Sequence, residues 1–149
     1  MRCPSCGHPE SKVLDTRMAK NNASIRRRRE CLACEYRFST VEEILRENLR
    51  VIKVDGSRED FDRNKILNGI RKATDGRPVE MERIDMMVSE LIDRLEKRYP
   101  GEIPTRAIGE EIMEQLRHID ELAYVRFAIA YKNIRDIAEL EEQLSSIRG

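Results

Sequence analysis

The stretches Cys3-Pro4-Ser5-Cys6 and Cys31-Leu32-Ala33-Cys34 contain all four cysteines of the chain and decide how its first part folds. Zinc takes four thiolate ligands at the corners of a tetrahedron, and a turn with two residues between its cysteines brings two thiolates to one side of the ion. Two such turns close the site and leave no open position for catalysis. We therefore expect one Zn²⁺ ion per chain, held by Cys3, Cys6, Cys31 and Cys34. Unliganded thiols and a redox cysteine pair are the alternatives, but neither needs a second matching pair.

The sequence around these cysteines is typical of a small β-structure. Short β-prone segments such as Lys12–Asp15 and Tyr36–Val41 alternate with Gly, Pro, Asn and Ser, and no long helical period is visible. Four cysteines with short strands between the pairs form the zinc-ribbon pattern. Because about 40 residues supply too little core to fold alone, we expect the metal to hold this module together. We interpret His8 as an ordinary loop residue.

A run of four arginines precedes the second cysteine pair. Arg26, Arg27, Arg28 and Arg29 repel one another unless anions lie nearby, and Arg17 and Arg37 add positive charge to the same module. Arginine suits bidentate contacts with phosphate or with guanine edges. On a zinc-held ribbon the run indicates nucleic-acid binding. A solvated charged strand is the alternative, and these residues alone do not separate duplex DNA from RNA.

The chain changes character near residue 46. Asn48–Val54 is predicted to be a strand, Asp55-Gly56 a hairpin turn and Arg58–Phe61 a short return strand. Asp62 is a suitable N-cap for a helix that begins near Arg63. The linker around residues 42–48 is short.

Further helices follow this hairpin. Apolar residues recur at helical spacing from Ile84 to Leu95, and Tyr99-Pro100-Gly101 ends that helix. Thr105 is predicted to cap the next helix, and a last long helix is expected from about Asp120 to beyond Leu140. The fold class is therefore α+β, with a small four-cysteine ribbon followed by a mainly α-helical domain that starts with a β-hairpin.

The hairpin and the helix after it carry a weak signal for an anionic ligand. Lys65 lies in the first turn of the predicted helix, where free N–H groups attract phosphate, and Lys53 can converge on the same place. Glu59 on the return strand suits a ribose hydroxyl or a base amine. The sequence has no Walker A motif and no G-x-G-x-x-G motif. A surface hairpin with scattered lysines is the alternative.

Charge and hydrophobicity limit the function classes. Charged residues make up 38% of the chain and the formal net charge is zero, yet residues 1–45 hold nine Lys and Arg against six Asp and Glu. No stretch approaches the roughly 20 apolar residues that span a bilayer, and the first residues contain no apolar signal core. We expect no membrane partner and a cytoplasmic location, with nucleoid association when DNA is bound.

The motifs together resemble a known family. Cys3-Pro4-Ser5-Cys6, Val13-Leu14-Asp15-Thr16-Arg17, the arginine run and Phe38-Ser39-Thr40-Val41-Glu42 are similar to the bacterial ribonucleotide reductase transcriptional repressors, the NrdR family. From Val51 to about Ile137 the chain resembles an ATP-cone, particularly at Val51-Ile52-Lys53, Phe61-Asp62 and Ala123-Tyr124-Val125-Arg126-Phe127-Ala128. The order and spacing of both halves are more specific than either half alone.

This resemblance implies a domain plan and a function. Residues 1–45 would be a zinc-ribbon DNA-binding domain, 46–137 an ATP-cone nucleotide-binding domain and 138–149 a C-terminal helical tail. The cone would bind ATP or dATP as allosteric ligands, and the homo-oligomeric state, a dimer or higher, would depend on the nucleotide. The ribbons would then hold paired operator boxes of double-stranded DNA upstream of reductase genes, and no reaction would be catalysed.

The resemblance also assigns site residues. The nucleotide-binding set would be Val51, Lys53, Val54, Glu59, Lys65 and Tyr131, and the DNA-binding set would be Arg17, Arg26, Arg27, Arg28, Arg29 and Arg37. Val54 departs from the family pattern because a basic residue is common at this position in ATP-cones.

Three questions stay open at this point. A nucleotide hydrolase or transferase is the enzymatic alternative, although the chain has two histidines and no clear nucleophile–base pair. A zinc ribbon that binds RNA or a protein partner is another. The apolar stripe of Ile137, Leu140, Leu144 and Ile147 is expected to pack on the cone, or else on a neighbouring subunit.

Overall fold

The computed structural model describes all 149 residues. The chain divides into two compact units, Met1–Leu45 and Arg46–Gly149. The α+β fold class is confirmed, because strands and the four cysteines make up the first unit and all the helices belong to the second.

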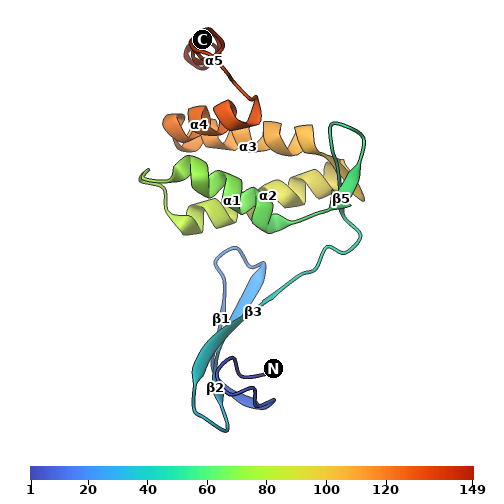
Figure 1. Ribbon diagram of the computed structural model, residues 1–149, viewed down its shortest axis with the longest axis vertical. Coiled ribbons are helices and arrows are strands. Elements are labelled where there is room, and N and C mark those ends of the chain that lie inside the picture. Colours follow the sequence, from blue (N-terminus) through green and yellow to red (C-terminus); the bar gives the residue numbers. More distant parts are fainter. The chain divides into compact units, whose positions relative to one another are not determined.

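The first unit is a three-stranded antiparallel sheet. Its strands are β1 (Ser11–Met18), β2 (Ser24–Cys31) and β3 (Arg37–Glu43), in the order β1-β2-β3 (Figure 1). The arginine run is the middle of the central strand. Arg17 pairs with Arg26 and Asp15 with Arg28, whereas Val13 pairs with Arg29, so Leu14 forms a β-bulge in β1.

This unit has almost no apolar core. Among its hydrophobic residues only Cys3 and Cys31 are buried. Val13, Met18 and Val41 on the strands are exposed. Apolar burial on this scale stabilises a fold only slightly, so a bound metal is the natural source of its stability.

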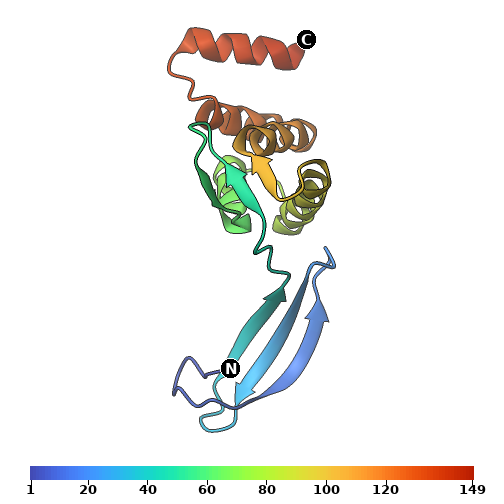
Figure 2. The same cartoon turned by 90° about the vertical axis from the view of Figure 1, so that its right-hand side faces the viewer.

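The second unit begins with two short strands and continues as helices. β4 (Arg50–Ile52) pairs antiparallel with β5 (Arg58–Asp60) and parallel with β6 (Glu102–Pro104), which gives the order β5-β4-β6 (Figure 2). The helices are α1 (Arg63–Thr74), α2 (Met81–Arg98), α3 (Thr105–Ile119), α4 (Glu121–Tyr131) and α5 (Ile137–Arg148). The predicted hairpin and the helix that follows it are present.

The core of this unit is aliphatic, as expected for a chain without tryptophan. The apolar face of α2 lies at its centre, where Val88, Leu91 and Ile92 are completely buried. Asp62 is the N-cap of α1, because its side chain accepts a hydrogen bond from the backbone N–H of Asn64 at 2.9 Å. The periodicity of the apolar residues therefore predicted these two helices correctly.

The prediction of one long final helix was wrong. The helical conformation is interrupted between α4 and α5, where Asn133 has a positive φ of 52°. Asp136 then starts a new helix by accepting a hydrogen bond from the backbone N–H of Glu139. Asparagine tolerates the left-handed conformation and aspartate caps helices, so these two residues encode the break.

The start of α3 also differs from the prediction. Thr105 is the first helical residue rather than the cap, and Pro104 occupies the cap position without a side-chain hydrogen bond. The residues before it form β6, a strand that was not predicted from the sequence. A three-residue strand is too short to show an alternating pattern.

Helix α5 has one buried side chain, and this side chain is polar. It belongs to Gln143, which donates to the hydroxyl of Tyr124 at 2.9 Å and accepts from Nζ of Lys132 at 2.6 Å. Ile147 packs against the core, whereas Ile137 is 74% exposed. The stripe therefore packs on its own cone only in part. None of the helices has the length and apolar character required to cross a membrane.

Candidate functional site

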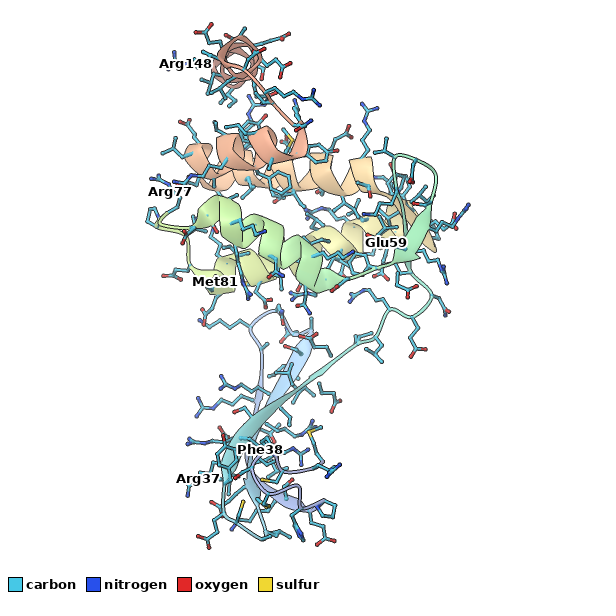
Figure 3. All side chains as sticks on the ribbon, viewed as in Figure 1. Arg37, Phe38, Glu59, Arg77, Met81 and Arg148 are labelled. Atoms are coloured by element: carbon cyan, nitrogen blue, oxygen red, sulfur yellow. The ribbon has the colours of Figure 1, made fainter.

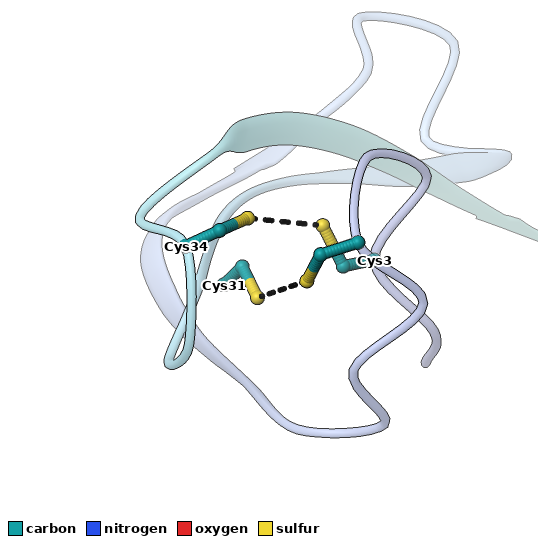
Figure 4. Close-up of side chains that lie close together, drawn as sticks. Cys3, Cys31 and Cys34 are labelled. Atoms are coloured by element: carbon teal, nitrogen blue, oxygen red, sulfur yellow. Dashed lines mark hydrogen bonds between the residues drawn. The ribbon is translucent and has the colours of Figure 1, made fainter.

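The four cysteine sulfurs form a compact cluster between two turns (Figure 4). All four Sγ atoms lie within 4.8 Å of one another, with 3.7 Å between Cys3 and Cys34 and 3.6 Å between Cys6 and Cys31. Zinc–sulfur bonds of about 2.3 Å in a tetrahedron require sulfurs about 3.8 Å apart. The donor set and its spacing therefore fit one zinc ion with no ligand position left open.

The two cysteine turns have the same backbone geometry. The N–H of Gly7 donates to the carbonyl of Cys3 at 3.0 Å, and the N–H of Glu35 donates to the carbonyl of Cys31 at 3.1 Å. In each turn a backbone N–H also approaches the first sulfur at 3.4 Å, from Ser5 in one and from Ala33 in the other. N–H groups directed at sulfur stabilise the thiolate, which is the form that binds metal.

The cluster does not hold four negative charges without a cation. Burial raises the pKa of Cys3, but backbone N–H groups of Cys6 and Ser5 outweigh it and bring that pKa down to about 7. At Cys34 the backbone N–H of Tyr36 lowers the pKa, yet burial and the neighbouring cysteines raise it to about 12. One thiol thus ionises at the expense of another. A divalent cation removes this conflict by stabilising every thiolate.

One face of the ribbon sheet is cationic. The register places Arg17 beside Arg26 and Asp15 beside Arg28. On β3, Arg37 pairs with Glu30 and lies on the same face of the sheet. Arg26 and Arg28 are both exposed. The face encloses a hollow of about 570 Å³ lined by Asp15, Arg17, Arg26, Arg28, Arg37, Phe38 and Ser39. Arg37 and Phe38 are labelled on β3 in Figure 3.

The other two arginines of the run lie on the opposite face, because strand side chains alternate. Arg27 forms an ion pair with Glu42 at 2.6 Å. Arg29 donates to the hydroxyls of Thr40 and Ser11 at 3.1 and 3.4 Å. Both are half-buried and engaged inside the ribbon. The structure thus brings Arg17, Arg26, Arg28 and Arg37 together, and it does not bring Arg27 and Arg29 to them.

In the second unit, one carboxylate lies between two lysines. Glu59 lies on β5 and is labelled in Figure 3. Its carboxylate is 3.3 Å from Nζ of Lys53 and 3.2 Å from Nζ of Lys65. Hydrogen bonds from Lys65 and Lys53 lower the pKa of Glu59 despite its partial burial. The two lysines predicted from sequence therefore do converge, and in the absence of a ligand they share this carboxylate.

A pocket of about 190 Å³ opens beside this cluster. Strands β4 and β5 and helices α1, α3 and α4 contribute its walls, and most of the lining is apolar. The lining residues are Val51, Glu59, Phe61, Asp62, Lys65, Ile66, Gly69, Thr105, Ile108, Gly109, Ile112, Phe127 and Tyr131. An apolar cavity with a few charged groups at its rim is typical of a small-molecule site.

The predicted nucleotide residues do not all line this pocket. Val51, Glu59, Lys65 and Tyr131 line it, and Lys53 reaches it through its ion pair with Glu59. Val54 is 96% exposed and lines a neighbouring cavity of about 550 Å³ instead.

The aromatic and glycine lining of the pocket was not predicted from the sequence. Phe127 and Tyr131 are stacked, with ring centroids 5.9 Å apart, and Gly69 and Gly109 face these two rings. The spacing of four residues between Phe127 and Tyr131 is the signal that would have revealed this pair, because such residues are neighbours on a helix.

Comparisons with known proteins cover both units. Residues 1–42 match the model described as "Transcriptional repressor NrdR-like, N-terminal domain", and residues 49–137 match the ATP cone domain. A transcriptional repressor NrdR of Opitutus terrae is 50% identical over 99% of this chain and 97% of its own length. The chain belongs to the NrdR family. NrdR proteins of Caldicellulosiruptor saccharolyticus and Streptococcus pneumoniae are 48% and 45% identical, again over 99% of this chain and over 96% and 94% of their own lengths.

Membership in the NrdR family confirms the resemblance stated from the sequence. Its zinc ribbon corresponds to the cysteine cluster and its ATP-cone to the unit with the apolar pocket. The NrdR relatives are named as transcriptional repressors and not as enzymes. The family is therefore regulatory, in agreement with the expectation that this chain is no enzyme.

Proposed function

We propose that this protein is a zinc-dependent repressor of ribonucleotide reductase genes that binds paired operator boxes in double-stranded DNA under the control of ATP and dATP. The relatives named as transcriptional repressors support the general role. The observation that carries the proposal for DNA is the cationic face of the ribbon, with Arg17, Arg26, Arg28 and Arg37 on one side of the sheet.

Arg28 has a special place on this face. Arg17, Arg26 and Arg37 each contact a neighbour, namely Asp15 at 2.8 Å, Ser39 at 3.5 Å and Glu30 at 2.9 Å. The guanidinium of Arg28, at the centre of the sheet, makes no ion pair or hydrogen bond and is free for phosphate or a base edge. Arg27 and Arg29 hold the sheet together in this proposal and do not touch DNA.

The experiment compares Arg28→Ala with Arg27→Ala, two neighbours on opposite faces. The zinc-loaded protein is titrated with DNA from upstream of the organism's own reductase genes and with a scrambled duplex, over a range of salt concentrations. Arg28→Ala should weaken operator binding about tenfold and reduce the salt slope by about one. Arg27→Ala should leave that slope unchanged. Equal effects of the two variants would contradict the assignment of faces, and tighter binding to a structured RNA of equal length would favour the RNA alternative.

For the nucleotide, we propose that phosphates of ATP or dATP take the place of the Glu59 carboxylate on Lys53 and Lys65, while the adenine enters the apolar pocket. The support is the Glu59 position between the two lysines, at the pocket rim. Glu59, once released, is able to accept from a ribose hydroxyl or from the base. Val51 lies on the wall and Tyr131 closes the far side, whereas Val54 is proposed only to approach a bound nucleotide from the hairpin turn.

Calorimetry with ATP and dATP tests this exchange. Lys65→Ala should lower the affinity for both nucleotides at least tenfold, because one charge-assisted phosphate contact is lost. Lys97→Ala, at the C-terminal end of α2 and outside the pocket, is the matched control. Unchanged affinity in Lys65→Ala would remove the proposed phosphate site. Substantial ATP hydrolysis that Lys65→Ala abolishes would instead revive the enzymatic alternative.

Oligomerisation would couple nucleotide binding by the cone to DNA binding by the ribbon. One ribbon contacts few base pairs, and specific sites usually need two or more half-sites, so we propose a homo-oligomer whose arrangement changes with the nucleotide. The functional division is 1–45 for DNA, 46–137 for nucleotide and 138–149 as a helical tail. Operator binding measured with no nucleotide, ATP, dATP and both tests this switch. Indifference to all four conditions would leave a DNA-binding ribbon without a nucleotide switch.

A further inference from the structure

Gly109 and Tyr131 make an unusually close contact in the wall of the apolar pocket. Gly109 lies in α3, and a Cβ atom added to it would lie 2.1 Å from Cε2 and 2.2 Å from Cζ of the Tyr131 ring. No side chain larger than a hydrogen fits there while the ring stays in place. The hydroxyl of Tyr131 donates to the carbonyl of Arg106 at 3.2 Å, one turn before Gly109 on the same helix. The ring is thus seated on the backbone of α3.

The same ring separates two cavities. Tyr131 and Thr105 line both the apolar pocket of about 190 Å³ and the neighbouring cavity of about 550 Å³. The larger cavity has a mixed lining that includes the cationic residues Arg106, Arg117 and Lys132. The volume of the smaller pocket suits a base but not a whole nucleotide, since ligand sites for complete small molecules run from about 300 Å³ upward. A displaced ring would join the two spaces and remove the wall that closes the base pocket.

We propose that Gly109 is a positioning residue of the nucleotide site, which acts by letting the Tyr131 ring lie on α3 as the wall of the base pocket. This inference rests on the proposed function, because it concerns the pocket assigned there to the adenine of ATP and dATP. Burial also raises the pKa of the Tyr131 hydroxyl. That pKa gives a spectroscopic signal for the seated ring that does not depend on nucleotide binding.

A second glycine supplies a matched control. Gly69 is also helical, also lines the pocket and also faces an aromatic ring of α4, that of Phe127. A Cβ at Gly69 would lie 3.7 Å from this ring, which is ordinary van der Waals contact. Gly69→Ala therefore adds the same methyl group to the same pocket without moving a ring. Alanine is also the better helix former, so this variant should not be destabilised.

The test measures ATP and dATP binding to the full-length zinc-loaded protein by calorimetry. Gly109→Ala should weaken both nucleotides about tenfold, the size of a lost aromatic contact with a base, and more than Gly69→Ala, which adds a methyl group to the same pocket without moving a ring. Titration of tyrosinate absorbance, referred to Tyr131→Phe, should show the pKa of Tyr131 closer to its ordinary value in Gly109→Ala. In a Tyr131→Ala background the change at Gly109 should have no further effect on affinity, because no ring is left to displace.

The outcomes separate this inference from the proposed function. A wild-type protein that binds neither nucleotide would refute the nucleotide site itself. A wild-type protein that binds, with Gly109→Ala binding equally well, would overturn only the role of Gly109. Should Gly109→Ala fail to fold, circular dichroism of Gly109→Ala/Tyr131→Ala decides the matter. A folded double variant supports the ring as the cause, and an unfolded one contradicts it.

Discussion

At the scale of single residues, Gly7 and Glu35 occupy equivalent positions in the two cysteine turns. Both have a left-handed backbone, with φ of 76° and 58°. Glycine adopts this conformation freely, whereas a residue with a Cβ is strained by roughly 1 kcal/mol. Glu35→Gly should therefore stabilise the zinc-loaded ribbon, by at most about 1 kcal/mol because glycine also gains entropy in the unfolded chain.

The reverse change at the other turn is the control. Gly7→Ala introduces the strain that Glu35 already carries, and its Cβ would lie 3.2 Å from a guanidinium nitrogen of Arg2. Thermal unfolding should show that Glu35→Gly is more stable than the wild type and that Gly7→Ala is less stable. Competition with a chromophoric chelator should give the same order for zinc affinity. A less stable Glu35→Gly protein would mean that the glutamate side chain contributes more than its backbone costs.

Asp120 illustrates how a buried carboxylate links stability to pH. It accepts two hydrogen bonds from Arg77 at 3.0 and 2.9 Å and one from the backbone N–H of Ala123, and these partners hold its pKa below the ordinary value. A depressed folded-state pKa stabilises the fold above the unfolded value of about 4, and this stability is lost as the pH falls through the folded value. The helical unit should thus lose stability below about pH 4, partly through this group.

The variant Asp120→Asn isolates the ion pair, because asparagine still caps α4. Its melting temperature at pH 7 should fall by about 5 °C, and the difference from the wild type should shrink as the pH falls below 4. Asp62→Asn keeps its cap as well and has no ion pair to lose, so it should melt close to the wild type. A difference that persists unchanged at pH 2 would argue against the charge as the cause.

At the scale of elements, α5 depends on Gln143. The partners of this side chain, Tyr124 and Lys132, both belong to α4 or its cap position. Gln143→Ala would leave both without this partner and would remove the only buried side chain of α5. Hydrogen exchange should then show fast exchange throughout α5 and unchanged protection in α2. In Gln143→Glu, which keeps the contact with Lys132, the exchange rate of α5 should lie between those of the wild type and of Gln143→Ala. Full protection of α5 in Gln143→Ala would show that its apolar stripe suffices.

Elements with a strong local signal were predictable from sequence, and elements defined by distant partners were not. The hairpin, the Asp62 cap and the apolar face of α2 follow from turn chemistry and periodicity. β6 exists because it pairs with β4, some 50 residues earlier in the chain. The break after α4 was encoded in Asn133 and Asp136 but hidden by the apolar pattern that continues on both sides of it.

The candidate sites show the same division. The cysteine spacing predicted that the four sulfurs would cluster, since four ligands at fixed spacing allow few alternatives. The four arginines were indistinguishable in sequence, and only the strand register separates Arg26 and Arg28 from Arg27 and Arg29. The Tyr131 ring on Gly109 joins helices α3 and α4, and no local pattern reports such a contact.

At the scale of the whole molecule, the two units derive their stability from different sources. The second has a continuous aliphatic core, while the first has only Cys3 and Cys31 buried among its hydrophobic residues. Removal of zinc with a chelator should unfold the first unit and abolish DNA binding. The helical ellipticity at 222 nm and nucleotide binding should survive, because they belong to the second unit. Readdition of zinc should restore DNA binding, and loss of the helical signal on chelation would show that the cone also needs the metal.

The bulge at Leu14 gives β1 one extra residue relative to β2. Before the bulge Lys12 faces the same side as Glu30, and after it Asp15 and Arg17 face the same side as Arg28 and Arg26. Deletion of Leu14 would remove the bulge and keep both halves in register, because Val13 and Asp15 would then oppose the consecutive residues Arg29 and Arg28. A residue inserted between Asp15 and Arg17 would instead turn Arg17 to the back of the sheet if the half near the zinc keeps its register. Within this family, loss of the bulge residue should therefore be tolerated far better than a change of length between Asp15 and Arg17.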